Sequence, residues 1–413
     1  MEEREHVLLA ACHFPNQDDE HFHSSLDELR ALTETAGGEV MKVVTQKRPR
    51  AHPALYMGEG KVHEMLEEVE ARDIELVIFN GELSPSQMRN LSNELGGIRV
   101  IDRTQLILDI FAGRAETKEG KLQVELAQLQ YLLPRLSGQG AFLSRQGGGI
   151  GTRGPGETKL ESDRRHIQRR ITDIKRRFET VVSQRDQYRK RRKENNVFQI
   201  AVVGYTNAGK STLFNHLTNS KSLQEDQLFA TLDPLTRQIQ LPSGFEALLS
   251  DTVGFIQDLP TTLVAAFRST LEEVTEADFI LHMVDASHPD HVQHEKTVQK
   301  LLGDLEADHV PQLTVYNKKD LLSAEFMPLN IPSITISALD PIDYKRLFEK
   351  IETVLKEGWE PYDVSVPAYE AQLLHRLERH TIRTLQEFNE EDETFRVEGY
   401  IKHDHPLAHQ LKK

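Results

Sequence analysis

The sequence predicts a multidomain α/β protein, and three features lead to that prediction. Its 413 residues are enough for two to four domains. Strand-like and helix-like segments alternate in two separate stretches, a rhythm typical of open sheets with parallel strands. A long helical region interrupted by glycines separates these stretches. We therefore expect an N-terminal α/β domain over 1–115, a helical hairpin with a glycine-rich loop over 116–196, a second α/β domain over 197–357 and a small α+β domain over 358–413.

The composition is that of an ordinary globular chain, with 38% hydrophobic and 28% charged residues. A net charge of −15 argues at first against a nucleic-acid partner. No apolar stretch approaches the ~18 residues of a membrane span, so we expect no membrane insertion. The acidic N-terminus lacks the pattern of a signal peptide, and the single cysteine, Cys12, cannot form an internal disulfide. These observations favour a cytoplasmic protein, which we expect to be a monomer.

The first domain is predicted from alternating short apolar runs and longer segments with helical spacing. The expected strands are Val7–Cys12, Val40–Val44, Glu75–Phe79 and Ile98–Ile101, and the expected helices are Ser24–Thr35, Gly60–Arg72 and Ser84–Leu95. Ser24 and Ser84 are the predicted N-caps. The run Gly58-Glu-Gly60-Lys61 lacks the full spacing of a phosphate loop, so we interpret it as a glycine turn that opens a helix.

The middle region is predicted to be a hairpin of two helices. A helix from Lys121 carries leucines at 122, 126, 129, 133 and 136, and a second helix over Glu157–Lys193 carries apolar residues at 160, 167, 171, 174, 178 and 181. Between them, residues 138–156 hold eight of the chain's 24 glycines. We expect the two apolar stripes to pair and the glycines to form the tip of the hairpin.

The last two domains follow the same reasoning. In the second α/β domain the expected strands are Gln199–Val203, Ala247–Ser250, Phe279–Val284, Leu313–Tyr316 and Ile334–Ile336. In the C-terminal domain we expect a helix over Tyr369–Phe388 and a strand over Thr394–Ile401.

A phosphate-binding loop lies directly after the strand Gln199–Val203 and before a helix. It consists of Gly204, Tyr205, Thr206, Asn207, Ala208, Gly209, Lys210 and Ser211, and Thr212 follows in the helix. The glycines let backbone N–H groups wrap phosphate, and Lys210 reaches the β- and γ-oxygens. We expect Ser211 and Thr231 to bind Mg²⁺, Asp251 to point toward it, and Lys210, Thr231 and the Gly254 N–H to act on the γ-phosphate.

Two further loops predict that the base is guanine. Asn317, Lys318 and Asp320 follow the strand Leu313–Tyr316, at the edge where open α/β sheets bind ligands. The Asp320 carboxylate can accept from N1–H and the exocyclic amine of guanine, a pair that adenine does not offer. Asn317 would meet the base or tie its loop to the phosphate loop, and Lys318 would lie along the ring. Ser337, Ala338 and Leu339 can offer backbone N–H groups to the guanine oxygen.

This ordered set resembles the translation-factor-like class of P-loop GTPases, with a Ras-like domain that binds GTP or GDP. Two residues depart from the Ras-like pattern. Phe255 stands where a glutamine would orient the attacking water, so we expect slow hydrolysis unless a partner stimulates it. Asn207 lies three residues before Lys210, as in GTPases that bind a monovalent cation, and potassium dependence is a hypothesis. The alternative is an Asn207 that only stabilises the turn of the loop.

The helix over 163–193 reverses the first inference from net charge. This segment carries a net charge of +9, which leaves −24 for the rest of the chain. Such a helix is either an electrostatic footprint for RNA phosphates or a solvated face that forms salt bridges. The neighbouring glycine-rich tip, with Phe142, favours RNA because its backbone can approach closely and an aromatic ring can stack. The candidate RNA contacts are Arg145, Arg153, Arg164, Arg165, Arg169, Arg170, Arg176 and Arg177.

Residues 151–165, Gly-Thr-Arg-Gly-Pro-Gly-Glu-Thr-Lys-Leu-Glu-Ser-Asp-Arg-Arg, resemble the HflX family of GTPases, and the domain order matches that family over nearly the whole chain. The phosphate loop, the run Phe229-Ala-Thr231-Leu-Asp-Pro and the run from Asp251 to Ile256 also look like the family's forms, which adds Phe229 to the nucleotide site. The resemblance implies a ribosome-associated GTPase that binds the large subunit, places its hairpin loop near the peptidyl-transferase centre, and splits stalled or hibernating ribosomes.

Other functions remain open at this point. A GTPase of ribosome assembly would have the same guanine site. An ATP-dependent, helicase-like factor that remodels rRNA through the N-terminal domain is a second alternative, and a nucleotide-gated RNA-binding adaptor is a third. Some HflX proteins are reported to bind ATP through the N-terminal domain, but the sequence shows no complete phosphate loop there.

Overall fold

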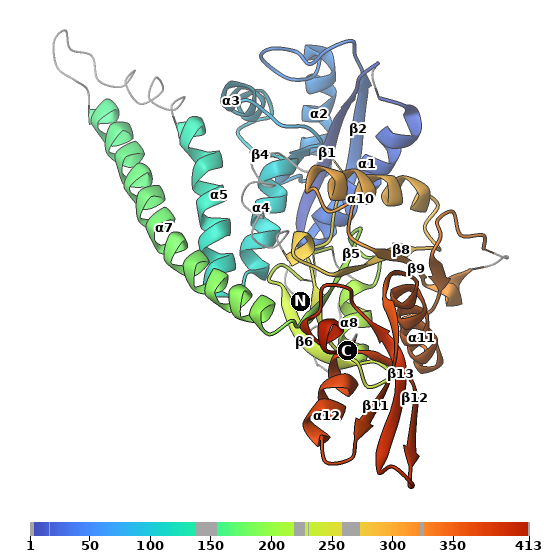
Figure 1. The fold of residues 1–413 in the computed structure, drawn as a ribbon. Coiled ribbons are helices and arrows are strands. Elements are labelled where there is room, and N and C mark those ends of the chain that lie inside the picture. Colours follow the sequence, from blue (N-terminus) through green and yellow to red (C-terminus); the bar gives the residue numbers. More distant parts are fainter. Residues whose placement is uncertain are drawn as a thin grey trace. The chain divides into compact units, whose positions relative to one another are not determined.

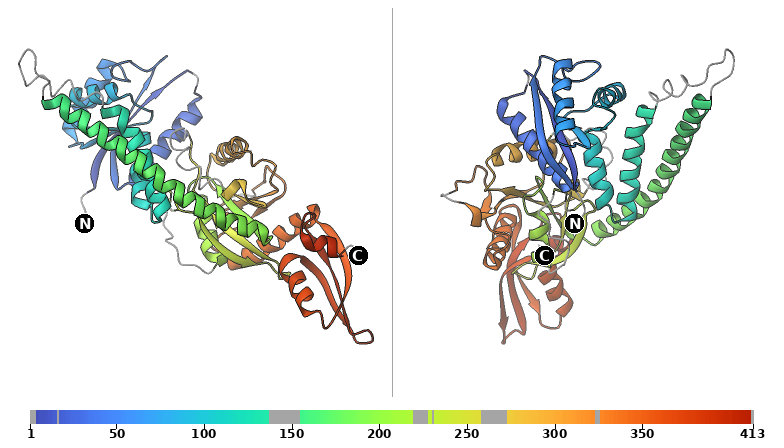
Figure 2. Two further views of the ribbon diagram at one scale, coloured as in Figure 1. Left: turned by 60° about the vertical axis from the view of Figure 1, so that its left-hand side comes forward. Right: turned by 180° about the vertical axis from the view of Figure 1, so that it is seen from behind.

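The computed structural model describes residues 4–15, 17–136, 155–218, 228–229, 231–257, 273–322 and 326–411 (Figures 1 and 2). Its contacts divide the chain into two compact units. The first contains residues 1–184, 227–232 and 257–268, and the second contains 185–226, 233–256 and 269–413. Among the described residues, no helix is long and apolar enough to cross a membrane. The predicted α/β fold class is confirmed.

The first unit is built on a parallel four-stranded sheet in the order β2-β1-β3-β4. Its strands are β1 (Glu5–His13), β2 (Gly38–Lys47), β3 (Leu76–Phe79) and β4 (Arg99–Asp102). Its helices are α1 (Asp19–Thr35), α2 (Glu59–Ala71), α3 (Pro85–Glu94) and α4 (Arg103–Arg114). All four strands that the sequence predicts are present, and Gly58 is the N-cap of α2, so it opens a helix as expected.

Of the two predicted N-caps, one is present in the structure and the other is not. The N-cap Ser84 is confirmed, with a capping box that it forms with Gln87. The predicted start of the first helix at Ser24 is wrong, because α1 begins at Asp19 with Asp18 as its N-cap. Ser24 is buried in the second turn, and the Asp18 carboxylate accepts from the His21 N–H. Asp19 and Glu20 favour that earlier start, since acidic side chains stabilise a first helical turn.

The hairpin consists of α5 (Lys118–Leu136) and α7 (Pro155–Glu194), which run side by side in Figure 1 and in the right-hand view of Figure 2. An ion pair joins them, with Arg170 Nε and Nη2 at 2.6 and 2.9 Å from the Glu125 oxygens. The buried stripe of α5 differs from the predicted run of leucines. Leu122 is buried, but the other buried residues of α5 are Gly120, Gln123, Val124, Ala127 and Tyr131. The glycine-rich tip lies outside the described residues.

The second unit contains the mixed six-stranded sheet of the GTPase-like domain, in the order β10-β9-β8-β5-β7-β6. Its strands are β5 (Phe198–Gly204), β6 (Leu235–Gln240), β7 (Glu246–Asp251), β8 (Phe279–Asp285), β9 (Gln312–Asn317) and β10 (Ser333–Thr335). Its helices are α8 (Lys210–Thr218), α10 (His291–Asp304), η2 (Lys319–Leu321, a single 3₁₀ turn) and α11 (Pro341–Gly358). Only β6 is antiparallel to its neighbour.

The C-terminal part corrects one expectation. The helix predicted over Tyr369–Phe388 is present only as α12 (Ala371–His380), and its second half is wrong, because the chain continues as strand β12 (Ile382–Asn389). β12 and β11 (Glu360–Pro367) pair antiparallel with β13 (Thr394–Ile401), and α13 (Pro406–Leu411) follows. Pairing with β13 overrides the local helix propensity of Leu385, Gln386 and Glu387.

Candidate nucleotide-binding site

The loop between β5 and α8 has backbone geometry that only glycine can supply at two positions. Gly204 has a φ of +153°, and a Cβ there would lie 2.2 Å from the Met283 carbonyl oxygen. Gly209 has a φ of +89°, and a Cβ there would lie 2.2 Å from Asn317 Nδ2. Because no side chain fits, backbone N–H groups can approach a ligand closely. α8 begins at Lys210, so the loop also faces the N-terminus of a helix.

Lys210 is held under this loop by the protein itself. Its side chain is buried, and Nζ donates to the Tyr205 carbonyl oxygen at 2.8 Å. Burial lowers the pKa of Lys210 to about 8, and the Asp251 carboxylate opposes that shift. Asp251 is the last residue of β7 and is fully buried. The structure therefore brings a lysine and a carboxylate together at the carboxyl edge of the sheet.

The segment after Asp251 lies directly on the loop. A Cβ at Gly254 would approach Thr206 Cγ2 to 2.8 Å and Lys210 Nζ to 3.0 Å. The Phe255 N–H donates to the Gly204 oxygen at 3.1 Å, and the Thr206 N–H donates to the Phe255 oxygen at 2.8 Å. The Phe255 ring is buried in an apolar cluster with Tyr205 and Val274. Its phenyl group thus serves the core, and it has no atom that could orient a water molecule.

Asn317 connects the predicted base-recognition loops to the phosphate loop. Its Nδ2 donates to the Ala208 oxygen at 2.9 Å, and its Oδ1 accepts from the Ala338 N–H at 2.8 Å. The sequence left open whether Asn317 contacts the base or the phosphate loop, and in the structure it is bonded to the phosphate loop. Asp320 is exposed and accepts from Ser337 Oγ at 2.6 Å, so these two loops meet at the same edge. Leu339, two residues after Ser337, is largely exposed.

Two acidic residues support this edge and were missed by sequence reasoning. Asp343 is almost fully buried, and one of its oxygens accepts from the Ser337 N–H at 2.8 Å and from Lys319 Nζ at 2.7 Å. These contacts hold the pKa of Asp343 below its usual value, although burial opposes the shift. Asp285 binds Lys318 Nζ at 2.7 Å. A carboxylate in the first turn of α11 was the available signal for Asp343, whereas Asp285 could be assigned only from strand order.

Phe229 and Thr231 belong to the first compact unit, and their place in the nucleotide site stays a prediction. The Phe229 ring is buried edge-on against Phe111 of α4, with ring centroids 4.5 Å apart. The preceding Leu228 N–H donates to Thr35 Oγ1 of α1 at 3.3 Å.

The same unit also binds Gln257, two residues after Phe255. Arg103 Nη2 donates to the Gln257 oxygen at 3.3 Å and lies 3.3 Å from Glu28 Oε1. Gln257 Nε2 donates to Ser24 Oγ at 3.4 Å. Segments that flank the predicted γ-phosphate contacts are therefore buried against helices of the N-terminal sheet.

The candidate RNA-binding arginines of α7 fall into two groups. Those exposed are Arg164, Arg165, Arg169, Arg176 and Arg177. Arg170 is partly buried and bound to Glu125. Arg145 and Arg153 lie outside the described residues.

A glycine loop between a strand and a helix, a buried lysine beside a strand-end aspartate, and an Asn-Lys-Lys-Asp loop tied to it by Asn317 define a P-loop GTPase. Residues 199–318 match the model of a family described as 50S ribosome-binding GTPase. Residues 23–112 and 114–192 match those described as GTP-binding GTPase N-terminal and GTP-binding GTPase middle region. The chain belongs to the HflX family of GTPases: it binds GTP and GDP and hydrolyses GTP.

The curated relatives match nearly the whole chain. It is 56% identical to the GTPase HflX of Alkalihalophilus pseudofirmus over 99% of this chain and 96% of that protein. It is 43% identical to the GTPase HflX of Escherichia coli over 90% of this chain and 88% of that protein. A solved structure of a GTP-binding protein from Sulfolobus solfataricus with GDP aligns with a TM-score of 0.45 and 24% identity, over 86% of this chain and 99% of that one.

Proposed function

We propose that this GTPase binds the large ribosomal subunit through the hairpin, near the peptidyl-transferase centre, and dissociates stalled or hibernating ribosomes in the cytoplasm. The observation that carries the proposal is the row of exposed arginines along α7, in a chain whose GTPase domain matches a family described as ribosome-binding. Arginine suits phosphate because its planar guanidinium binds two oxygens at once. The alternative of a solvated salt-bridge face applies to Arg170, which pairs with Glu125 of the other helix. It applies also to the exposed Arg165, Arg176 and Arg177, which pair with Glu161 or Asp173 of α7 itself.

Within the nucleotide site, each residue has a proposed role. Lys210 and the backbone from Gly204 to Gly209 bind the phosphates, and Asp320 with the Ser337–Leu339 loop binds guanine. The Ser337 and Ala338 N–H groups of that loop already donate to Asp343 and Asn317. Ser211, Thr231 and Asp251 offer hydroxyl and carboxylate oxygens, the ligand type that Mg²⁺ prefers, and Mg²⁺ would neutralise charge on the phosphates. Asn207, with a φ of +60°, has the left-handed conformation of a turn residue. A potassium requirement at Asn207 stays a proposal, which equal rates in sodium and potassium would remove.

Stimulation by the ribosome is the second part of the proposal. The buried Phe255 ring offers no hydrogen bond to a water molecule, so the attacking water needs an orienting group from elsewhere. We expect the isolated protein to turn over GTP more slowly than about once per second, below the ~1–100 s⁻¹ typical of efficient phosphoryl-transfer enzymes. Faster turnover by the purified protein alone would contradict this.

The decisive experiment measures the dissociation of ribosomes into subunits. Purified 70S ribosomes are mixed with the protein and GTP, GDP or a non-hydrolysable GTP analogue, and dissociation is followed by light scattering and gradient sedimentation. We expect dissociation with GTP and the analogue, and little with GDP. If no nucleotide supports dissociation, the splitting function is wrong.

Matched charge variants test the role of α7. Replacing Arg164, Arg165 and Arg169 by Gln removes three exposed charges from the hairpin, and the control replaces exposed Lys296, Lys300 and Lys345 by Gln. We expect only the hairpin variant to lose ribosome affinity, and its dependence of log Kd on log salt to become shallower by about 0.7–0.9 per lost phosphate contact. An equal loss in both variants would show that net charge alone governs binding.

A further inference from the structure

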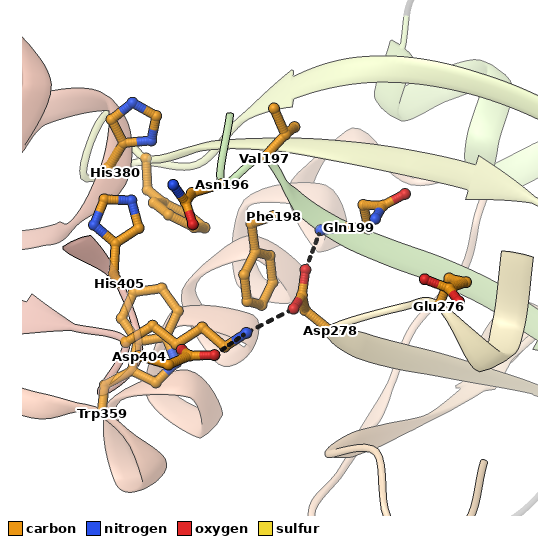
Figure 3. Close-up of a pocket in the computed structure, with 12 residues that line it drawn as sticks. Asn196, Val197, Phe198, Gln199, Glu276, Asp278, Trp359, His380, Asp404 and His405 are labelled. Atoms are coloured by element: carbon orange, nitrogen blue, oxygen red, sulfur yellow. Dashed lines mark hydrogen bonds and ion pairs between the residues drawn. The ribbon is translucent and has the colours of Figure 1, made fainter. Parts of the chain in front are cut away.

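A second cavity lies in the same unit as the nucleotide site but at the opposite edge of its sheet. It has a volume of about 300 Å³ and is lined at the start of β5 by Phe198, whereas the phosphate loop follows the end of that strand at Gly204. The rest of the lining comes from residues just after α7, from Phe245, Glu276 and Asp278 of the GTPase domain, and from the C-terminal domain (Figure 3). The volume is at the lower end of the ~300–1,000 Å³ range of small-ligand pockets. The cavity is therefore separate from the GTP site and large enough for a small planar group.

One side of this cavity is a wall of three aromatic rings. Phe198, Phe245 and Trp359 lie with ring centroids 5.2–5.6 Å apart and meet edge to face. Such rings form a rigid apolar surface that suits the face or edge of another planar ring.

Two histidines face each other on another side, as Figure 3 shows for His380 and His405. Their ring centroids are 5.2 Å apart. The Leu407 N–H donates to His405 Nδ1 at 3.2 Å, so the proton of the neutral ring is on Nε2. That Nε2 is buried and has no hydrogen-bond partner among the described residues. Burial lowers the pKa of His405 to about 4, which keeps the ring neutral near pH 7. His405 thus presents an unused N–H donor.

The charges around the cavity exclude phosphate as the ligand. Glu276, Asp278 and Asp404 line it together with a single amine, Lys402. Lys402 Nζ lies 2.7 Å from Asp278 Oδ1 and 3.5 Å from Asp404 Oδ2, so its charge is already compensated. The ligand must be planar and not anionic, and it must offer an acceptor to His405 Nε2.

The basic helix leads directly to this cavity. Asn196, two residues beyond the end of α7, is part of the lining. Gln199 is also part of it, and its Oε1 accepts from Arg192 Nη1 of the last turn of α7 at 3.1 Å. Lys190 and Arg191 of that turn are exposed. The cations of α7 therefore end beside a pocket whose charges disfavour phosphate but whose aromatic rings suit a planar base.

We propose that this cavity binds an unpaired nucleobase of the RNA whose backbone follows α7. Bases that leave a stack are commonly held between aromatic side chains and read by hydrogen bonds to their edges. The proposal rests on the proposed function only in taking RNA as the partner of α7.

Trp359 is the only tryptophan of the chain and lines the cavity, so its fluorescence reports on the site. The full-length protein is titrated with an end-labelled RNA oligomer of about ten nucleotides, the scale of a single-strand binding site, and with an abasic oligomer of the same length. Label anisotropy measures binding of the backbone. We expect both oligomers to bind through α7, but only the base-containing one to change Trp359 emission and to bind more tightly.

Two substitutions of His405 separate folding from binding. His405→Asn keeps an acceptor for the Leu407 N–H and removes the Nε2 donor, whereas His405→Gln keeps a donor near the Nε2 position. We expect about tenfold weaker binding of the base-containing oligomer for His405→Asn, partial rescue by His405→Gln, and GTP turnover unchanged in both.

Several results would overturn the proposal: equal Trp359 changes with both oligomers, no anisotropy change with either, or an equal Trp359 response to spermidine, which would assign the cavity to a cationic ligand. A base-dependent signal without ribosome dissociation would instead leave the cavity's role standing and remove the splitting function.

Discussion

The chain contains two sheets with parallel strands, and their carboxyl edges differ in what occupies them. In the GTPase sheet, Gly204 and Gly209 leave room for backbone N–H groups to face a ligand. In the N-terminal sheet, the protein's own side chains fill the corresponding edge. Asp102, the last residue of β4, is fully buried and accepts from the Tyr131 hydroxyl at 2.8 Å and the Leu83 N–H at 3.0 Å.

The point where strand order reverses in the N-terminal sheet is likewise occupied by side chains of the protein. Ligands of open α/β sheets bind where strand order reverses, which here is between β1 and β3. Asn80, just after β3, is bound there by Arg103 at 2.9 Å and by Ser25 at 2.9 Å. Arg103 in turn binds the Gln257 oxygen. The carboxyl edge of a parallel sheet is therefore not a ligand site by position alone, because side chains of the protein can occupy it and bind its polar groups.

The largest expected effect is on base choice at the GTPase edge. Asp320→Asn replaces an acceptor by an amide that can donate to the 2-carbonyl of xanthine, while its oxygen can still accept from Ser337. We expect the preference for GTP over XTP to fall by about 10⁴-fold, because unpaired polar groups are strongly rejected. Competition binding measures the ratio, with exposed Asp304→Asn of α10 as the control. An unchanged ratio would remove Asp320 from the guanine site.

Lys210→Ala tests directly whether only one of the two edges binds a nucleotide. Loss of a buried cation at the phosphates should lower GTP turnover by about 10²–10³-fold, the cost of removing one preorganised charge-stabilising group. Turnover of GTP and of ATP is measured in the same preparations. ATP turnover that survives Lys210→Ala would contradict the difference between the two sheets, since the N-terminal sheet would then have a nucleotide site of its own.

Asp102→Ala tests the carboxyl edge of the N-terminal sheet, which the protein's own side chains occupy. It removes the buried carboxylate 3.3 Å from Arg135 Nη2, and Arg135, which stacks on Tyr131, keeps only the exposed Glu82 carboxylate at 3.8 Å. We expect a loss of about 3 kcal/mol in the free energy of unfolding, or roughly 150-fold in the equilibrium. Tyr131→Phe, which removes one hydrogen bond, should cost about 1 kcal/mol.

Denaturant unfolding measures both Asp102→Ala and Tyr131→Phe, and GTP affinity should not change in either. A weaker GTP affinity for Asp102→Ala would show that the edges are not independent.

The smallest effect is expected at Arg103. The pair Arg103→Met with Glu28→Gln removes the Arg103 donor to the Gln257 oxygen without leaving a buried charge, while Gln257 keeps its contact to Ser24. We expect release of a fluorescent GDP analogue to become about 2- to 30-fold faster, the range of coupling energies between linked segments. Stopped-flow fluorescence measures it, with exposed Arg99→Gln as the control. Identical release rates would mean that the N-terminal sheet does not hold this segment in the nucleotide cycle.

Local sequence patterns were sufficient to predict most helices and strands, but not the strands that form only by pairing with a distant strand. β3 is a continuous apolar run, β1 contains one over Val7–Cys12, and β8 is apolar except for His282 and Asp285, so their burial follows largely from composition. Strand β12 has the residues of a helix and becomes a strand through its register with β13, from Ile382 opposite Tyr400 to Asn389 opposite Thr394. Strands β6 and β11 were not predicted either: they pair with β7 and β13, which the sequence does predict, but their own residues are largely polar or charged and form no apolar run.

The phosphate loop, the predicted guanine-recognition loops and the basic helix could be identified from the sequence, because their chemistry depends on residues that are adjacent in the chain or spaced along one helix. The contacts between distant segments came only from the folded chain. Asn317 reaches the phosphate loop across 109 positions, Arg103 reaches Gln257 across 154, and His380 meets His405 beside Trp359. Such contacts depend on sheet order and on burial, which no local pattern encodes.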